Sequence, residues 1–526
     1  MKQQSLLTST ILLTISSLLV RTINMISMIF LSQILGSEGI GIYELTMSIY
    51  MTGVVFASAG LSASVSRMVA EELGQKQDGN IKKIMGIALS FAITAGLLIS
   101  CILFTFAPHF ANNFIHNTQS TKALRFLALS IPFIACSSCF KGYFYAMRKT
   151  IYPASSDILE QFVKLGLIFV LVQIAPQFGI ENTYVQVAMG LTLGEMISWS
   201  YLFTLFLVES KKQIFTSSST LSIKEVCKRL ASILIPIAMI SYISYIFLPI
   251  ENIIIPNGLK KSGESLSSSM SLYGILKGMV LPILFFPSAF LTAFSTTLIP
   301  EIAKANILKL KERVHITTSR VLQLSFILSF LVVAIFLSYS NELGFILYKS
   351  DAIGPMLRML AIIVPFTYIE VITDGILKGL NKQIYCLKYS ILDSICRIVL
   401  LYIFLPFKGI QGLIGIMIIS SIFTSTLNFN KLLAVTHIKF QLTSWLIKPT
   451  IAAAFASSYS RLIINKLFRY SLGLTTKVLL GISLIVVLYI AVLFLIQAIK
   501  QDDLVWLRKQ LSFSSYKKHS IKIQAR

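Results

Sequence analysis

Fourteen apolar runs, each long enough to cross a lipid bilayer, constrain the fold of this 526-residue chain more than any other feature. A transmembrane helix needs about 20 mainly apolar residues. Charged residues make up 13% of the sequence, about half of the roughly 25% typical of soluble domains, which excludes a water-soluble multidomain enzyme. We therefore predict an all-α integral membrane protein. The runs lie near residues 7–33, 42–69, 84–108, 122–147, 153–175, 183–208, 229–249, 270–299, 317–340, 356–380, 384–406, 410–433, 445–464 and 475–498.

The distribution of lysine and arginine predicts which side of the membrane holds the chain ends. With an even number of spans, both termini lie on one side. Of the 46 basic residues, 30 fall in the termini, the loops on their side and the adjoining helix ends, and 11 fall in the opposite loops and their helix ends. Because cytoplasmic loops carry the excess of positive charge, we expect both termini in the cytoplasm. The net charge of +24 is thus an orientation signal, and we expect no nucleic-acid partner.

An internal repeat relates the two halves of the chain. Segment 43–71 aligns without gaps with 273–301 at an offset of 230, and 124–169 aligns with 357–402 at an offset of 233. The offset covers six spans, so both units insert with the same orientation, as in transporters whose substrate path lies between the halves. The alternative, a duplicated bundle without a pathway, would not need the buried charges described below. Identical pairs include Tyr43 and Tyr273, Glu71 and Glu301, Pro132 and Pro365, and Gly142 and Gly375.

The repeat and the loop composition together predict the domain organisation. We expect an N-terminal six-helix lobe over 1–210 and a second six-helix lobe over 229–440, joined by a cytoplasmic linker at 211–228. Two additional transmembrane helices follow over 441–499. The basic tail, 500–526, would lie against the anionic inner leaflet.

Several basic residues lie inside predicted spans, where a charge is costly and faces a cavity or a partner. Arg21, Lys141 and Lys277 have no acidic partner close in sequence. Because fixed positive charge in a low dielectric attracts phosphate strongly, we expect these three to bind an anionic head group. Arg67, at the cytoplasmic end of its helix, fits either a contact with that head group or a side chain that reaches to the interface.

Three pairs of opposite charges lie inside spans with a spacing of four residues, which places both members on one helix face. The pairs are Glu160 with Lys164, Asp374 with Lys378, and Asp393 with Arg397. Two interpretations stay open. Each pair neutralises itself and holds its lobe together, or one member is released to bind substrate or a coupling cation.

Motifs for covalent chemistry are missing from the sequence. It contains no Walker A, HExxH or GxSxG motif, so we expect no catalytic residue, no bound metal and no cofactor. Cys136 and Cys139 form a CxxC on an apolar helix without a second pair, a pattern that favours packing. The longest outward loop is expected near 250–269, with Glu251 and Glu264 as its acidic residues.

Four segments near the N-terminus resemble one family of membrane proteins. They are Ile29-Phe-Leu-Ser32, Leu35-Gly-Ser-Glu-Gly-Ile-Gly-Ile-Tyr43, Ser48-Ile-Tyr-Met51 and Ser66-Arg-Met-Val-Ala-Glu71. The chain is similar to the stage V sporulation protein B family, in the polysaccharide-transporter branch of the superfamily that contains MATE antiporters and lipid II flippases. The resemblance extends over essentially the whole chain.

This resemblance implies translocation of an undecaprenyl-linked oligosaccharide or peptidoglycan precursor across the cytoplasmic membrane, for spore cortex or envelope synthesis. It implies alternating access of two lobes around a cationic cavity, driven by an ion gradient or the membrane potential. Arg21 matches a basic residue usual in the family's first helix. Met28 and Gln33 stand where two further basic residues are usual, and Ser48 and Ser62 stand where the second helix usually has prolines.

Two other functions stay open on the sequence alone. A cation-coupled drug antiporter of the MATE kind would need a dominant buried acid in the N-terminal lobe, and Glu160 is available although Lys164 lies beside it. A membrane scaffold for envelope-synthesis enzymes would need no transport pathway. The expected partners are a lipid-linked sugar, membrane lipids and a coupling cation.

Overall fold

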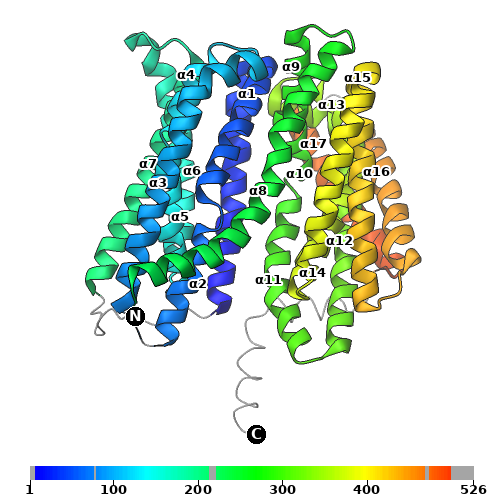
Figure 1. Ribbon diagram of the computed structural model, residues 1–526. Helices are drawn as coiled ribbons and strands as arrows, with labels where there is room; N and C mark the ends of the chain where they lie inside the picture. The colour runs from blue at the N-terminus through cyan, green and yellow to red at the C-terminus, as the bar shows by residue number, and fades with distance from the viewer. Residues whose placement is uncertain (1–5, 76, 78, 213–220, 468–472, 499–526) are drawn as a thin grey trace. The chain divides into compact units, whose positions relative to one another are not determined.

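The structure is a computed structural model that describes residues 6–75, 77, 79–212, 221–467 and 473–498. All regular elements among these residues are helices (Figure 1), which confirms the predicted fold class. The predicted basic tail, 500–526, lies outside the described residues, as does 213–220 of the predicted linker.

The helices follow one another along the chain with short connections. Their bounds are α1 Leu6–Ser58, α2 Leu61–Gly74, α3 Gly79–Phe110, η1 Ala111–Ile115, α4 Ser120–Ala128, α5 Ile131–Ala146, α6 Ile151–Ile174, η2 Ala175–Phe178, α7 Thr183–Lys212, α8 Ile223–Lys261, α9 Leu266–Gly274, η3 Ile275–Val280, α10 Leu281–Phe285, α11 Ser288–Ile307, α12 Lys311–Tyr348, α13 Ile353–Leu360, η4 Ala361–Ile363, α14 Val364–Gly379, α15 Gln383–Thr436, η5 Thr443–Ile447, α16 Lys448–Leu467 and α17 Leu474–Leu495.

Eleven helical stretches of the described chain are long and apolar enough to cross a membrane. Two of them, Leu12–Gly74 and Gln383–Thr436, contain 63 and 54 residues, enough for two crossings each at about 1.5 Å per residue. With these two counted twice, the described helices give thirteen crossings, roughly consistent with the predicted fourteen.

Two long helices are each divided by a glycine in a left-handed backbone conformation. Gly36 in α1 has φ 67° and ψ 179°, and Gly409 in α15 has φ 54° and ψ −141°. Residues other than glycine rarely adopt such backbone dihedrals. Each glycine separates two arms of its helix, and the chain of α1 turns back on itself at Gly36 (Figure 1).

Two predicted spans are interrupted rather than continuous. The expected helix 42–69 breaks at Gly60, which has φ 78° and separates α1 from α2. The expected helix 122–147 divides into α4 and α5, with Pro132 in the first turn of α5. Proline is tolerated there because the first N–H groups of a helix have no partner within it. Its repeat counterpart Pro365 occupies the same place at the start of α14.

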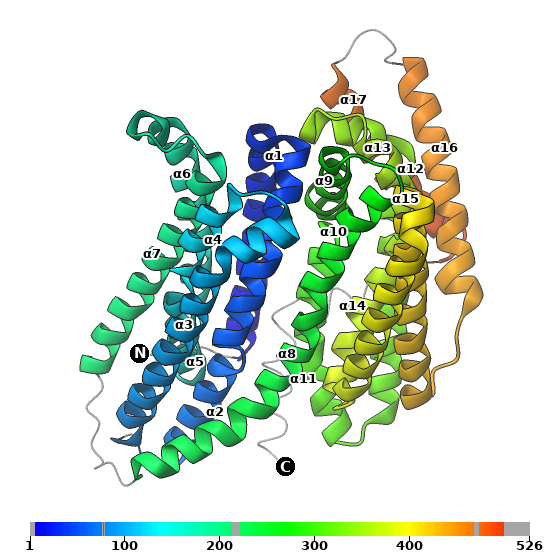
Figure 2. The same ribbon diagram turned by 45° about the horizontal axis from the view of Figure 1, so that its top comes forward.

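Helix α8 corrects the predicted loop near 250–269. The helix continues to Lys261, so Glu251 is buried inside it instead of lying in an outward loop. It begins with a capping box, in which Ser222 and Glu225 exchange hydrogen bonds. Its first part runs beside α2 in both views (Figures 1 and 2). The helix need not end before Glu251, because basic side chains inside the protein neutralise that charge.

The contacts divide the chain into two compact units. The first holds Met1–Leu298 and Lys382–Thr424, and the second holds Ile299–Asn381 and Ser425–Arg526. These bounds differ from the six-helix lobes expected from the repeat, whose division stays a prediction. The charged residues of the candidate site lie mainly in the first unit.

In the second unit, the two C-terminal helices α16 and α17 pack on α12. Ala456 is fully buried, and a side chain at Gly481 would collide with the ring of Tyr339. The Tyr489 hydroxyl donates a hydrogen bond to the carbonyl oxygen of Ile327 at 2.8 Å. Small residues let helices approach closely in membranes, so these two helices are an integral part of this unit.

Candidate functional site

Arg21 lies on the first arm of α1 with an exposed side chain. Within the part of the chain that the structure describes, it makes no ion pair. This agrees with the lack of a partner expected from the sequence. An unpaired guanidinium in a membrane-spanning helix is available to an anionic ligand, since it presents five donors in a fixed fork.

Lys141 has a partner, so its interpretation as an unpaired cation is wrong. The Nζ of Lys141 on α5 lies 2.7 Å from Oδ1 of Asp157 on α6. The turn between α5 and α6 brings these residues together although they are 16 positions apart. A search for partners one helical turn away therefore misses the pair.

Lys164 on α6 is held between two buried carboxylates. Its Nζ lies 2.7 Å from Oε1 of Glu160, one turn away, and 2.5 Å from Oε1 of Glu195 on α7. Ser198 donates a hydrogen bond to the other oxygen of Glu160 at 3.2 Å. The three charged side chains are only 12% to 14% exposed. The predicted pair is confirmed and extended, and the cluster ties α6 to α7.

The corresponding cluster in the second half is arranged differently. Glu251 on α8 faces two cations, with Oε1 at 3.5 Å from Nζ of Lys277 and Oε2 at 3.2 Å from Nη2 of Arg397. Arg397 also lies 3.8 Å from Oδ2 of Asp393, the partner expected from the sequence, and Ser420 donates to Oδ1 of Asp393 at 2.7 Å. Lys277 is therefore paired, contrary to the sequence interpretation.

Asp374 and Lys378 form the third expected pair, at 2.6 Å on α14 in the second unit. Their side chains are 35% and 47% exposed, so water screens the pair and its contribution to stability is small.

Arg67 lies at the end of the first unit where α2 meets α8. Its Nε is 2.9 Å from Oε1 of Glu71. Arg229 on α8 binds the same carboxylate at 2.8 Å and the buried Glu72 at 2.7 Å. Arg67 itself is 66% exposed, which agrees with a side chain that reaches toward the membrane interface.

Sequence reasoning missed several acidic residues that complete these clusters. Asp157 lies three residues before Glu160, and its charge inside a span was the available signal. Glu251 was assigned to a loop. Glu44 on the second arm of α1 was also missed, and its Cγ lies within 3.7 Å of where a side chain on Gly278 would begin.

Close backbone packing brings α1 against α9, next to Lys277. A Cβ on Gly41 would lie 2.1 Å from the carbonyl oxygen of Met270, and one on Gly274 would lie 2.1 Å from that of Ser37. The hydroxyls of Ser37 and Ser271 are 2.6 Å apart. Only glycine permits this approach, so helices from the two repeats meet here through their backbones.

Many apolar helices with buried ion pairs between them place this chain in the class of polytopic membrane proteins. In this class, charged residues inside the membrane usually have a functional role. Comparisons with known proteins identify the family. The polysaccharide biosynthesis protein family matches residues 6–305, more than half of the chain, and the chain belongs to this family.

Individual relatives cover most of the chain. Stage V sporulation protein B of Bacillus subtilis (strain 168) is 23% identical over 418 residues, which span 78% of this chain and 80% of that protein. Lipid II flippase MurJ of the same organism is 23% identical over 426 residues, spanning 75% and 76%. A solved structure of lipid II flippase MurJ in an inward closed conformation shares the fold, with a TM-score of 0.66, 15% identity, and coverage of 91% of this chain and 98% of that one.

Proposed function

We propose that this protein is a flippase that translocates an undecaprenyl-linked oligosaccharide or peptidoglycan precursor across the cytoplasmic membrane by alternating access. The observation that carries the proposal is the set of cations on the membrane-spanning helices, above all the unpaired Arg21. Membership of the polysaccharide biosynthesis family and the similarity to lipid II flippase MurJ support it. The relative stage V sporulation protein B favours a role in spore cortex or envelope synthesis.

The work of such a protein is conformational, and the proposal assigns no catalytic residue. Arg21 would hold the pyrophosphate of the substrate, since guanidinium and phosphate form strong charge-assisted hydrogen bonds. Lys277 would join it once its present partner is displaced. Lys141 and Arg67 are weaker candidates, because each already has an acidic partner.

We assign the three charge pairs, two largely buried and one partly exposed, to lobe stability or to ion coupling. Lys164, bound by Glu160 and by Glu195 on α7, would hold α6 on α7 during transport, because removing Lys164 leaves two carboxylates buried without their cation. Asp393 with Arg397 and Asp374 with Lys378 are candidates for coupling to a cation. A MATE-type antiporter is less well supported, since Glu160 is already neutralised by Lys164.

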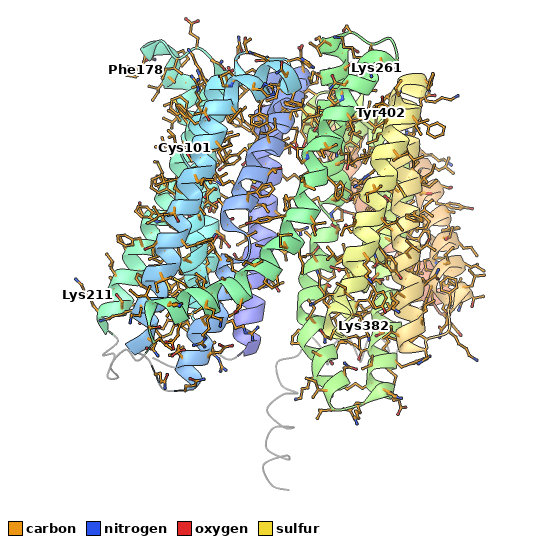
Figure 3. The ribbon with its side chains drawn as sticks, in the orientation of Figure 1. Cys101, Phe178, Lys211, Lys261, Lys382 and Tyr402 are labelled. Atoms are coloured by element: carbon orange, nitrogen blue, oxygen red, sulfur yellow. The ribbon has the colours of Figure 1, made fainter. Side chains whose placement is uncertain are left out.

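For the orientation, we propose cytoplasmic termini. In the first unit, Lys211 and Lys382 lie at the end of the helices opposite to Lys261 (Figure 3). The predicted topology likewise puts the loops of Lys211 and Lys382 on the cytoplasmic side and the loop of Lys261 on the other side. Lys261 lies 5.8 Å from the ring centroid of Tyr402, an aromatic of the kind that gathers at membrane interfaces.

A reconstituted flipping assay tests the proposed function. Proteoliposomes would contain a fluorescent undecaprenyl pyrophosphate-linked sugar, with and without an imposed membrane potential. We expect protein-dependent movement between leaflets, slowed by Arg21→Ala. Folded protein that moves no lipid-linked sugar but exchanges a cationic drug for cations would favour the antiporter. Full function after cross-linking the two repeats would favour the scaffold.

A further inference from the structure

Glu251 is one carboxylate that serves two cations. Its two oxygens face different partners, Lys277 at 3.5 Å and Arg397 at 3.2 Å. Both distances exceed the 2.5 Å and 2.7 Å at which Lys164 meets its two carboxylates. Charge-assisted hydrogen bonds between nitrogen and a carboxylate normally measure about 2.7–2.9 Å, so Glu251 neutralises both cations while satisfying neither fully.

Several polar atoms around Glu251 lack hydrogen-bond partners. Within the described residues these are Nε of Arg397, Oδ1 of Asn252 and the hydroxyl of Tyr273, all buried. Asn252 adjoins Glu251, and Tyr273 lies about one turn before Lys277. Buried polar groups are almost always hydrogen-bonded, and an unsatisfied one calls for an explanation. Two of these three atoms are donors, which suit an additional anion.

The repeat gives two cations equivalent positions but different partners. The offset of 233 places Arg397 opposite Lys164. Lys164 obtains its second carboxylate from Glu195 on α7, whereas Arg397 meets Glu251 on α8.

We propose that Glu251 is a built-in anion that competes with the head group of the substrate for Lys277 and Arg397. The pyrophosphate would displace the Glu251 carboxylate and take over the two cations together with the free donors of Arg397 and Tyr273. Pyrophosphate offers more acceptor oxygens and more charge than one carboxylate, so it wins this exchange, whereas a monoanion does not. Glu251 thus makes the site selective for a multiply charged head group. This inference rests on the proposed function.

Binding of undecaprenyl pyrophosphate to the purified full-length protein tests the inference, with undecaprenol and inorganic pyrophosphate as comparison ligands. We expect Glu251→Gln to bind undecaprenyl pyrophosphate about tenfold more tightly than wild type. The affinity of Glu251→Gln for a ligand with a single phosphate should rise by a larger factor than its affinity for pyrophosphate. Equal or weaker binding of undecaprenyl pyrophosphate by folded Glu251→Gln would overturn the inference.

Glu209→Gln is the matched control. Glu209 is a buried carboxylate paired with Lys149, outside the proposed head-group site, and its loss should leave affinity unchanged. If Glu251→Gln binds inorganic pyrophosphate more tightly than wild type but does not bind undecaprenyl pyrophosphate more tightly, the site recognises the free anion rather than the lipid-linked one. If wild type binds undecaprenyl pyrophosphate no better than undecaprenol, the proposed function itself fails.

A charge-balanced pair of variants covers the case in which Glu251→Gln does not fold. Arg397→Gln alone leaves Lys277 bound to Glu251 and should weaken binding. Adding Glu251→Gln to it frees Lys277 without changing the net charge relative to wild type, so the double variant should bind more tightly than Arg397→Gln. A double variant that binds no better than the single one contradicts the competition.

Discussion

The two halves of the chain each hold a charge cluster around an equivalent cation, Lys164 or Arg397, but they connect it differently. In the first half, one cation, Lys164, is bound at short distance by two carboxylates. In the second half, one carboxylate, Glu251, is shared at longer distance by two cations. The first arrangement leaves an excess of acid that fixes a cation in place. The second balances two cations with two carboxylates, since Asp393 also faces Arg397, but its contacts are longer, and we propose that Glu251 can be exchanged for another anion.

The largest expected effect is on the first-half cluster. Lys164→Met would leave Glu160 and Glu195 buried with like charges facing each other, so we expect a loss of about 3–5 kcal/mol in the free energy of unfolding. Thermal unfolding in detergent would measure it, with Lys277→Met as the comparison. Similar stability losses in the two variants would remove the distinction between a holding cluster and an exchanging one.

The next effect concerns the backbone contact between the repeats. Gly274→Ala would place a methyl group 2.1 Å from the carbonyl oxygen of Ser37, and overpacking of this kind costs about 1–3 kcal/mol. We expect α1 and α9 to separate, which thiol labelling of Ser271→Cys would detect. Gly166→Ala is the control, because a Cβ there meets nothing within 4 Å. Unchanged labelling in Gly274→Ala would contradict the close contact.

Removing the unpaired cation should change transport and spare the fold. Arg21→Ala deletes a side chain without an ion pair among the described residues, so the unfolding temperature should stay close to that of wild type. Flipping should fall about tenfold, as expected for one lost phosphate contact. A large drop in Tm would instead mean that Arg21 has a structural partner.

The smallest expected effect is at Arg67. Glu71 keeps Arg229 as a partner when Arg67 is removed, and exposed ion pairs contribute less than about 1 kcal/mol. Arg67→Ala should therefore alter unfolding by only a few tenths of a kcal/mol. Arg229→Ala, which strands the buried Glu72, should cost clearly more, and the reverse order would contradict this assignment.

The fold could be predicted well because the length of each apolar run and the internal repeat can be read directly from the sequence. The spans, the parallel repeat and the i, i+4 pairs such as Glu160 with Lys164 depend on residues close together or at a fixed offset. The interruption at Gly60 was missed because the flanking residues remain apolar and continue the helical pattern.

The candidate site could be predicted only in part, because its partners come from different helices. Asp157 and Lys141 meet across a turn, and Glu251 meets Arg397 from a helix far along the chain. Such contacts depend on tertiary packing rather than on spacing. Arg21 makes no ion pair among the described residues, as expected from the sequence, and its role stays a prediction.

The most direct test of the proposed function is flipping of an undecaprenyl pyrophosphate-linked sugar by purified protein in vesicles. We expect wild type to accelerate movement between leaflets, Arg21→Ala to reduce the rate about tenfold, and Glu209→Gln to match wild type. Movement no faster than in protein-free vesicles, or an unchanged rate in Arg21→Ala, would contradict the proposal that cations inside this bundle carry an anionic lipid head group across the membrane.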